Sequence, residues 1–297
     1  NFVILTVQDL HKSYGRHKVL DGISFEIGHP EIVALVGPNG SGKSTLLSII
    51  TNLIPADKGE VRILGKSNKN PNIFREISFM QDNSVLYEDL TGYDHLQFIG
   101  DVQGLTKAQI MEAAERVGME GYLHKKVGKY SLGMKQHLLF TMAIVNHPKL
   151  LILDEPLNGL DPTSAIRLRN MLLELLKEGT TILLSSHNLA EIDRVTSHIL
   201  FIKEGRLIEE DLSAYEKVIY EFTLKDTEKG MSVLSELGLA VEKGEENKIF
   251  VTIGDTTLNR IFALLNEHNI EVLSLEKKVA GSEERYQSIF GVREESA

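Results

Sequence analysis

The sequence contains no cysteine among its 297 residues. It therefore excludes disulfides, thiolate chemistry and zinc–thiolate sites. Long hydrophobic runs are also lacking, since none approaches the ~18 to 20 apolar residues that span a bilayer. The opening stretch has neither the basic region nor the long apolar core of a signal peptide. Together these absences predict a protein that stays in the cytosol.

A surplus of basic residues is missing as well. The formal net charge is −10 and the sequence pI is about 5.5, whereas proteins that grip nucleic acid usually carry a basic surplus. We therefore expect no nucleic-acid partner. Apolar residues make up 42% and charged residues 25%, which is ordinary for a globular protein. The length fits one large domain followed by a small one.

Patterns typical of buried strands alternate with helical patterns through the first two thirds of the chain. This alternation predicts a mostly parallel sheet covered on both faces, hence an α/β domain over residues 1–212. A helical subdomain is expected at about 91–146. The candidate strands lie at 32–36, 77–80, 150–153 and 180–185, and the candidate helices of the subdomain at 94–103, 107–117 and 122–127.

A second domain is predicted at 213–297, after a boundary near 210–217. Its patterns follow a β-α-β-β-α-β order, with a last helix at 282–290. This order suits a small α+β, ferredoxin-like domain. No recognisable catalytic constellation occurs in it, so we expect a regulatory or dimer-stabilising role.

A glycine-rich loop at 37–44 matches the pattern G-x-x-x-x-G-K-[ST]. Glycines let backbone N–H groups approach phosphate oxygens, and the helix that follows points its positive N-terminus at the anion. Lys43 would reach the β- and γ-phosphates, and the Ser44 hydroxyl would bind Mg²⁺. An accidental match occurs in roughly one chain of this length in a hundred. The expected ATP-binding residues here are Gly37, Pro38, Asn39, Gly40, Ser41, Gly42, Lys43, Ser44 and Thr45.

Two acids end the buried strand predicted at 150–153. In phosphoryl-transfer proteins an Asp at the carboxyl end of a strand helps to hold Mg²⁺, which makes Asp154 the metal candidate. Glu155 follows it and could orient or deprotonate the attacking water. Alone, such a pair is equally well explained as solvated acids at a strand end, but the phosphate loop favours the catalytic interpretation.

With these residues placed, the chain resembles the ATP-binding subunits of ABC transporters over about residues 3–210. The resemblance implies a P-loop NTPase fold, with ATP and Mg²⁺ as ligands. It implies adenine stacking by Tyr14, Mg²⁺ sensing and partner contact by Gln81, and a switch role for His187. It also places the signature at 130–134 and the D-loop at 159–161. Singly, each of these side chains would be explained as well by ordinary packing or hydrogen bonding.

The signature departs from the family's common form, L-S-G-G-Q. Leu132 replaces the first glycine and Met134 replaces the glutamine, whereas Ser131 and Gly133 remain and could contact a γ-phosphate. The run 131–136 resembles the bacitracin and lantibiotic export and immunity branch. That branch often continues with arginine, where this chain has His137.

The resemblance also implies partners. In the family, two cassettes face each other head to tail, so we expect a homodimer or a sister cassette. A membrane permease on a separate chain would dock near 81–90 and 91–128, which would place this chain on the cytoplasmic face of the membrane. Export of a peptide antibiotic or drug is the leading function. Import, another cargo, a soluble ABC ATPase of DNA repair or ribosomes, and a non-hydrolysing nucleotide-gated module remain alternatives.

Overall fold

The computed structural model describes residues 3–212, 218–244, 247–253, 258–279 and 282–291. These residues form two compact units, Asn1–Glu210 and Asp211–Ala297. Part of the predicted domain boundary, residues 213–217, lies outside the described residues.

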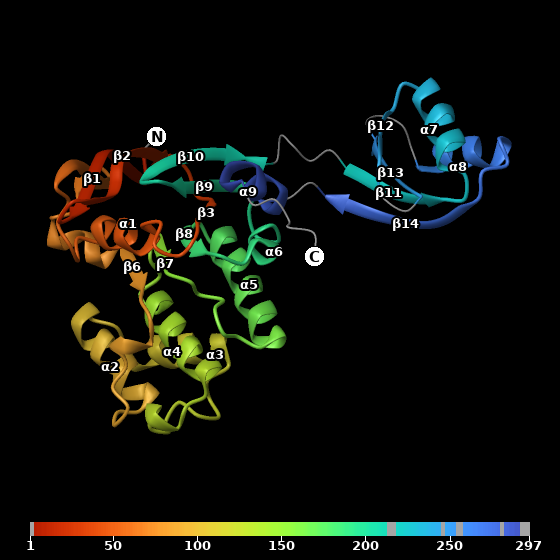
Figure 1. The fold of residues 1–297 in the computed structure, drawn as a ribbon. Coiled ribbons are helices and arrows are strands. Elements are labelled where there is room, and N and C mark those ends of the chain that lie inside the picture. Colours follow the sequence, from red (N-terminus) through yellow and green to blue (C-terminus); the bar gives the residue numbers. More distant parts are fainter. Residues whose placement is uncertain (1–2, 213–217, 245–246, 254–257, 280–281, 292–297) are drawn as a thin grey trace. The chain divides into compact units, whose positions relative to one another are not determined.

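A six-stranded sheet organises the first unit (Figure 1). Its strand order is β10-β9-β3-β8-β7-β6, and β3 pairs in parallel with β8 and β9, as β7 does with β6 and β8. Every residue of β3, β7 and β8 is buried, as expected for a sheet covered on both faces. The strands are β3 Ile32–Val36, β6 Ile77–Met80, β7 Leu150–Leu153, β8 Thr181–Ser186, β9 His198–Lys203 and β10 Arg206–Asp211.

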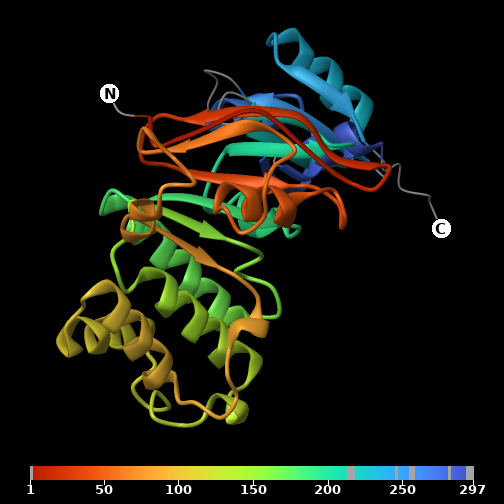
Figure 2. The same ribbon diagram turned by 90° about the vertical axis from the view of Figure 1, so that its left-hand side faces the viewer.

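A second, antiparallel sheet shares its core with the first. The helix α1, Lys43–Ile50, contributes Leu47 to one apolar cluster with Leu5, Ile23, Val33 and Leu200 from four strands. Figure 2 shows the red strands of this sheet above α1. The second sheet has the order β2-β1-β4-β5, formed by β1 Leu5–Tyr14, β2 His17–Ile27, β4 Lys58–Ile63 and β5 Lys66–Ser67.

Helices α2, α3 and α4 gather below the parallel sheet in Figure 1. Capping boxes begin α2 at Thr91 and α3 at Thr106, since each threonine bonds reciprocally with the residue three positions on. No helix among the described residues is long and apolar enough to cross a membrane. The helices are α2 Gly92–Gln103, α3 Lys107–Val117, α4 Leu132–Ile144, α5 Pro162–Lys177 and α6 Leu189–Ile192, with short 3-10 helices η1 Pro71–Arg75, η2 Asn83–Val85 and η3 Val127–Lys129.

The prediction of a helix at 122–127 is wrong. This segment forms turns that lead into η3. The Tyr130 hydroxyl donates to the carbonyl of Tyr122 at 2.8 Å, and the Tyr122 hydroxyl lies 2.9 Å from His137 Nδ1. Contacts of Tyr122 with Tyr130 and with His137 of α4 therefore override the local helical pattern.

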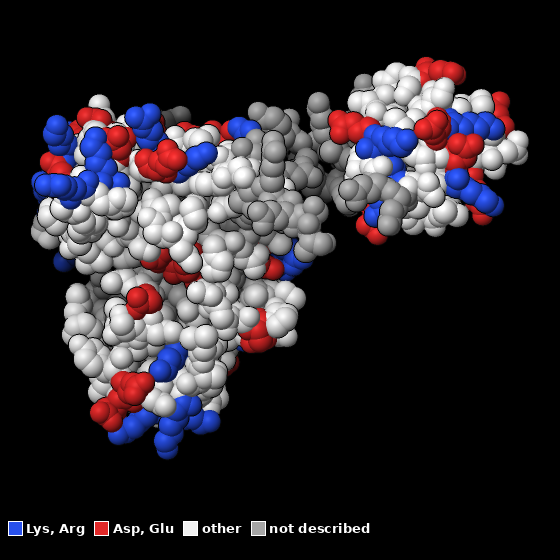
Figure 3. All heavy atoms as spheres, viewed as in Figure 1, with Lys and Arg blue, Asp and Glu red and all other residues white. Residues whose placement is uncertain are grey.

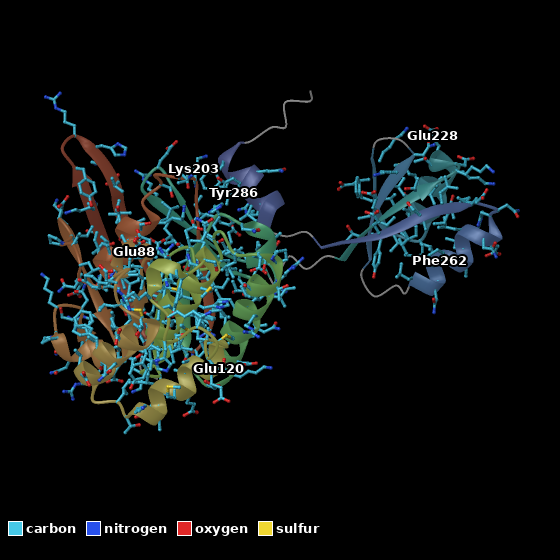
Figure 4. The ribbon with its side chains drawn as sticks, turned by 90° about the horizontal axis from the view of Figure 1, so that it is seen from below. Glu88, Glu120, Lys203, Glu228, Phe262 and Tyr286 are labelled. Atoms are coloured by element: carbon cyan, nitrogen blue, oxygen red, sulfur yellow. The ribbon has the colours of Figure 1, made fainter. Side chains whose placement is uncertain are left out.

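The described residues of the second unit form a four-stranded antiparallel sheet with two helices that contribute to its core, and a third helix follows the last strand. Its strand order, β12-β13-β11-β14, interleaves the two halves of the β-α-β-β-α-β sequence as a ferredoxin-like fold does. Its core contains Phe222, Leu234, Ile249 and Leu265. Figure 4 labels Glu228 on α7 and Phe262 on α8. The elements are β11 Val218–Leu224, α7 Thr227–Glu236, β12 Ala240–Lys243, β13 Lys248–Ile253, α8 Leu258–Glu267 and β14 Val272–Val279, followed by α9 Ser282–Phe290.

Candidate active site

The predicted phosphate loop joins β3 to α1. Gly42 precedes α1 with φ of 104°, a left-handed conformation that side chains rarely adopt. A Cβ added there would lie 2.9 Å from Val19 Cγ1. Both observations explain why the loop needs glycine at this position to enter the helix.

Lys43 is buried at the start of α1, with 7% of its surface exposed. Its ammonium donates to the Gly37 carbonyl at 2.8 Å, and Glu155 Oε1 lies 3.9 Å away. The neighbouring Ser41 hydroxyl is buried and has no hydrogen-bond partner among the residues that the structure describes. A buried cation is stabilised only when it is paired with an anion. The loop therefore fits a phosphate group, which would supply both charge and acceptors.

Ser185, near the end of β8, holds the two acids that follow β7. Its hydroxyl donates to Asp154 Oδ1 at 2.5 Å and accepts the backbone N–H of Glu155 at 2.9 Å. Glu155 has a left-handed φ of 50°, which is uncommon for a non-glycine residue and is often found at functional sites. Neighbouring parallel strands thus set the direction of both carboxylates.

His187 completes the group around Glu155. It follows β8, and its Nδ1 lies 2.8 Å from Glu155 Oε2. Glu155 therefore has Lys43 near one carboxylate oxygen and His187 on the other. This arrangement fixes a carboxylate beside the phosphate loop, where it can accept a proton from water or orient it.

A cavity of about 330 Å³ opens over this loop. His17 and Val19 from β2 line it, and the sequence-based prediction did not include them. Tyr14 does not line it; its ring is 54% exposed, and Lys12 Nζ lies 5.5 Å from the ring centroid. The lining residues are His17, Val19, Asn39, Gly40, Gly42, Lys43, Ser44, Thr45 and Glu155.

Three oxygen-bearing side chains could hold Mg²⁺ near this cavity. Ser44 lines it, and Asp154 and Gln81 directly follow Leu153 and Met80, which are paired between β7 and β6. Hydroxyl, carboxylate and amide oxygens are ligands that Mg²⁺ prefers. Among the described residues no cluster of three or more His, Cys, Asp or Glu could bind a metal unaided. The donor set therefore fits Mg²⁺ that is held partly by substrate phosphates.

Comparisons with known proteins agree with this geometry. A family model described as ABC transporter matches residues 20–158. The lantibiotic transport ATP-binding protein SrtF of Streptococcus pyogenes is 37% identical over 205 residues, which cover 69% of this chain and 89% of that protein. The chain belongs to the ABC transporter ATP-binding family. The bacitracin transport ATP-binding protein BcrA of Bacillus licheniformis is 32% identical over 302 residues, 97% of each chain.

Solved ABC structures share the fold. The structure of an ATP binding subunit of an ABC transporter matches with a TM-score of 0.66 at 26% identity, over 89% of this chain and 99% of that one. The predicted resemblance and P-loop NTPase fold are confirmed, as are ATP binding and ATPase function. The roles of single residues stay predictions.

The ABC signature lies at the start of α4 and does not line the cavity of its own chain. The hydroxyl of Ser131 accepts the backbone N–H of Met134 at 3.2 Å and caps the helix. Ser131 and Leu132 are exposed, and Gly133 is half-buried. Lys135 forms an ion pair with Glu88 (labelled in Figure 4) at 3.2 Å. Ser131 and Gly133 therefore lie outside the cavity over the phosphate loop of their own chain, and their predicted contact with a γ-phosphate would involve the ATP of a second copy.

Proposed function

We propose that this chain hydrolyses ATP to drive a separate membrane subunit that exports a peptide antibiotic. The observation that carries the hydrolytic part is the position of Glu155 between Lys43 and His187 at the phosphate-loop cavity. The proposed cargo is supported by BcrA, a bacitracin transport protein that aligns over 97% of both chains.

Each site residue has a proposed part in hydrolysis. Lys43 and the loop 37–45 bind the phosphates, and Glu155 orients or deprotonates the attacking water while His187 holds the carboxylate. A general base of this kind contributes about 10² to 10⁴ in rate. Ser44, Asp154 and Gln81 would hold Mg²⁺, which when bound neutralises charge on the phosphates. Tyr14 would stack on adenine from the rim of the cavity.

The ATP site is proposed to be shared between two copies. Ser131 and Gly133 of one copy would contact the ATP held by Lys43 of the other, because the signature does not line the cavity of its own chain. The test is the molecular mass in solution of the Glu155→Gln variant with and without ATP. We expect an ATP-dependent dimer. A monomer at every protein concentration would contradict the shared site.

The membrane subunit is proposed to bind beside Gln81. An apolar hollow of about 320 Å³ lies there, and Tyr87, Phe98 and Val102 each expose about two thirds or more of their surface. Exposed apolar patches commonly mark protein or membrane contacts. This docking would hold the chain at the cytoplasmic face of the membrane. The residues that line the hollow include Phe74, Phe79, Gln81, Val85, Ile99 and Gln103.

Co-purification tests this docking site. We expect Phe74→Asp to abolish co-purification of the membrane subunit while leaving ATP binding intact, because Phe74 is exposed and lines the hollow. Leu53→Asp is the matched control, since Leu53 is also exposed but does not line the hollow. Equal recovery of the membrane subunit with both variants would contradict the site.

Survival of cells tests the proposed cargo. Cells that express the chain with its membrane subunit should tolerate bacitracin or a lantibiotic, and the Glu155→Gln variant should remove that tolerance. Unchanged survival despite ATPase activity would favour another cargo. Absence of ATPase activity would instead favour a non-hydrolysing nucleotide-gated module.

The domain division is also a proposal, with an ABC ATPase over 1–212 and a regulatory or dimer-stabilising domain over 213–297. It is supported by the two compact units and by their separate apolar cores. A chain truncated after residue 212 should bind ATP but dimerise less readily. Unchanged dimerisation, ATPase rate and transport would contradict a role for the second domain.

A further inference from the structure

Leu132 lies against Gly159, which is 27 residues further along the chain. A Cβ added at Gly159 would overlap Leu132 Cδ2, so the leucine side chain covers the glycine Cα closely. Gly159 has a left-handed φ of 72° and lies in the loop that joins β7 to α5. Although Leu132 is 48% exposed, its buried side therefore connects the start of α4 to this loop.

The loop is fixed at its far end as well. Asp161 Oδ1 accepts the backbone N–H groups of Thr163 and Ser164 at 3.0 and 3.1 Å, and the Ser164 hydroxyl donates to Asp161 Oδ2 at 2.6 Å. The hydrogen bond from the Ser164 hydroxyl is the main reason that the pKa of Asp161 lies below its ordinary value. The carboxylate is thus well bound, and the loop cannot shift without disturbing the start of α5.

The near end of the loop joins the proposed catalytic residue. The backbone N–H of Asn158 donates to the carbonyl of Glu155 at 3.1 Å, and Ser185 holds the N–H of Glu155. A short, bonded turn therefore lies between Glu155 and Gly159. Movement of Gly159 would be transmitted to the backbone that directs the Glu155 carboxylate.

We propose that Leu132 is a positioning residue for ATP hydrolysis, acting through Gly159 on the loop that holds Glu155. The inference rests on the proposed function, because it assigns the effect of Leu132 to the ATP site that contains Glu155. Glycine at position 132, the residue of the common signature, would leave Gly159 uncovered. The common signature has two adjacent glycines, which have no side chain to contact the loop. In this chain Leu132 precedes Gly133 and provides a contact between the signature and the loop.

A double-mutant cycle on the full chain tests the contact. Leu132→Gly removes the side chain that covers Gly159, and Gly159→Ala forces the two apart. We expect each single variant to lower kcat by about tenfold and to leave KM for ATP within about twofold, because the phosphate loop is untouched. The double variant should be no slower than Gly159→Ala, since removing Leu132 makes room for the new methyl group. A rate equal to the product of the two single effects would overturn the proposal.

Conservative substitutions at Leu132 provide a second readout. Leu132→Met retains an apolar side chain long enough to reach Gly159 and should keep kcat within about twofold, whereas Leu132→Ala should behave like Leu132→Gly. This comparison decides the matter if Gly159→Ala fails to fold. Equal rates for the alanine and methionine variants would contradict the proposal.

The molecular mass in solution of the Glu155→Gln variant with ATP distinguishes a failure of this inference from a failure of the proposed shared ATP site. If that variant stays monomeric while the cycle is non-additive, the shared site is wrong and the role of Leu132 stands. If it dimerises while the cycle is additive, only the role of Leu132 is wrong. A wild-type chain without ATPase activity would contradict both.

Discussion

The parallel sheet of the first unit and the antiparallel sheet of the second unit differ in how charged groups are placed around them. In the first unit, β7 and β8 are buried throughout, and Asp154, Glu155 and His187 follow their carboxyl ends. In the second unit, exposed charges pair two at a time, as Lys225 does with Glu271 at 2.9 Å. Figure 3 shows Lys and Arg side chains beside Asp and Glu on the surface of each unit. Reactive groups thus converge where buried parallel strands end together.

Lys43 in the first unit and Lys225 in the second differ in burial and in bonding partner. Lys43 has 7% of its side chain exposed and bonds mainly to a backbone carbonyl, whereas the side chain of Lys225 is 72% exposed and already has a carboxylate partner. The hydrogen bond to Glu271 raises the pKa of Lys225 above its ordinary value. Lys43, whose nearest carboxylate oxygen is 3.9 Å away, retains donors for a phosphate, whereas Lys225 is already engaged in a solvated ion pair at 2.9 Å.

The largest effect that we expect is a loss of stability in the second unit without a loss of ATPase activity. Phe222→Ala removes a fully buried ring from the core of the second unit and should cost about 3 to 5 kcal/mol in the unfolding free energy of that unit. Chemical denaturation followed by far-UV circular dichroism measures this loss, since the sequence contains no tryptophan. The ATPase kcat should stay within about twofold. A large loss of kcat in folded protein would break the separation between the two units.

The next effect concerns the buried lysine. Lys43→Ala should lower kcat/KM for ATP by at least about 100-fold, because it removes a buried charge that faces the phosphates. Lys225→Ala is the control and should leave both binding and turnover unchanged. Isothermal titration with ATP and a steady-state phosphate assay would measure the two quantities. Similar behaviour of the two variants would contradict the distinction drawn between these lysines.

A smaller effect is expected at the serine that holds both acids. Ser185→Ala removes the hydrogen bonds to Asp154 and to the N–H of Glu155, and should lower kcat by about tenfold with little change in ATP affinity. Ser274→Ala in the second unit removes an exposed hydrogen bond from the Ser274 hydroxyl to Thr223 and should change neither kcat nor ATP affinity. Equal kcat values for the two serine variants would show that the acids need no such support.

The smallest effect is a pH-dependent change in stability. Burial lowers the pKa of His198, but hydrogen bonds to Glu31 and Glu209 outweigh it and raise the pKa above its ordinary value. Because the folded pKa is raised, the stabilisation is complete below pH ~6.5 and is lost as the pH rises through the folded pKa. His198→Gln should therefore lower Tm by about 2 °C at pH 5.5 and hardly at all at pH 9. The opposite pH dependence would contradict this assignment.

Features that lie in one short segment were predictable from the sequence. The strands at 32–36, 77–80 and 150–153 have their predicted bounds. At 32–36 and 150–153 the reason is that unbroken apolar runs mark strands buried on both faces. The phosphate loop was found for the same reason, since its residues are contiguous. The strand β10 was missed because it lies half-exposed at a sheet edge and carries Glu209 and Glu210.

Contacts between distant segments could not be predicted. Ser185 meets the two acids across 30 and 31 residues, and only the pairing of β7 with β8 brings them together. The contact of Leu132 with Gly159 depends likewise on where α4 begins relative to the loop after β7. Periodicity describes the faces of single elements and contains no information on which loops meet.

The central claim is that Glu155, held beside Lys43 by His187 and Ser185, hydrolyses the ATP bound by this chain. The most direct test measures ATP binding and turnover of Glu155→Gln in parallel with the wild-type chain. We predict ATP affinity within about threefold of wild type and a kcat at least about 100-fold lower, since the loop remains and only the base is lost. A variant that binds ATP and still hydrolyses it within tenfold of the wild-type rate would contradict the account.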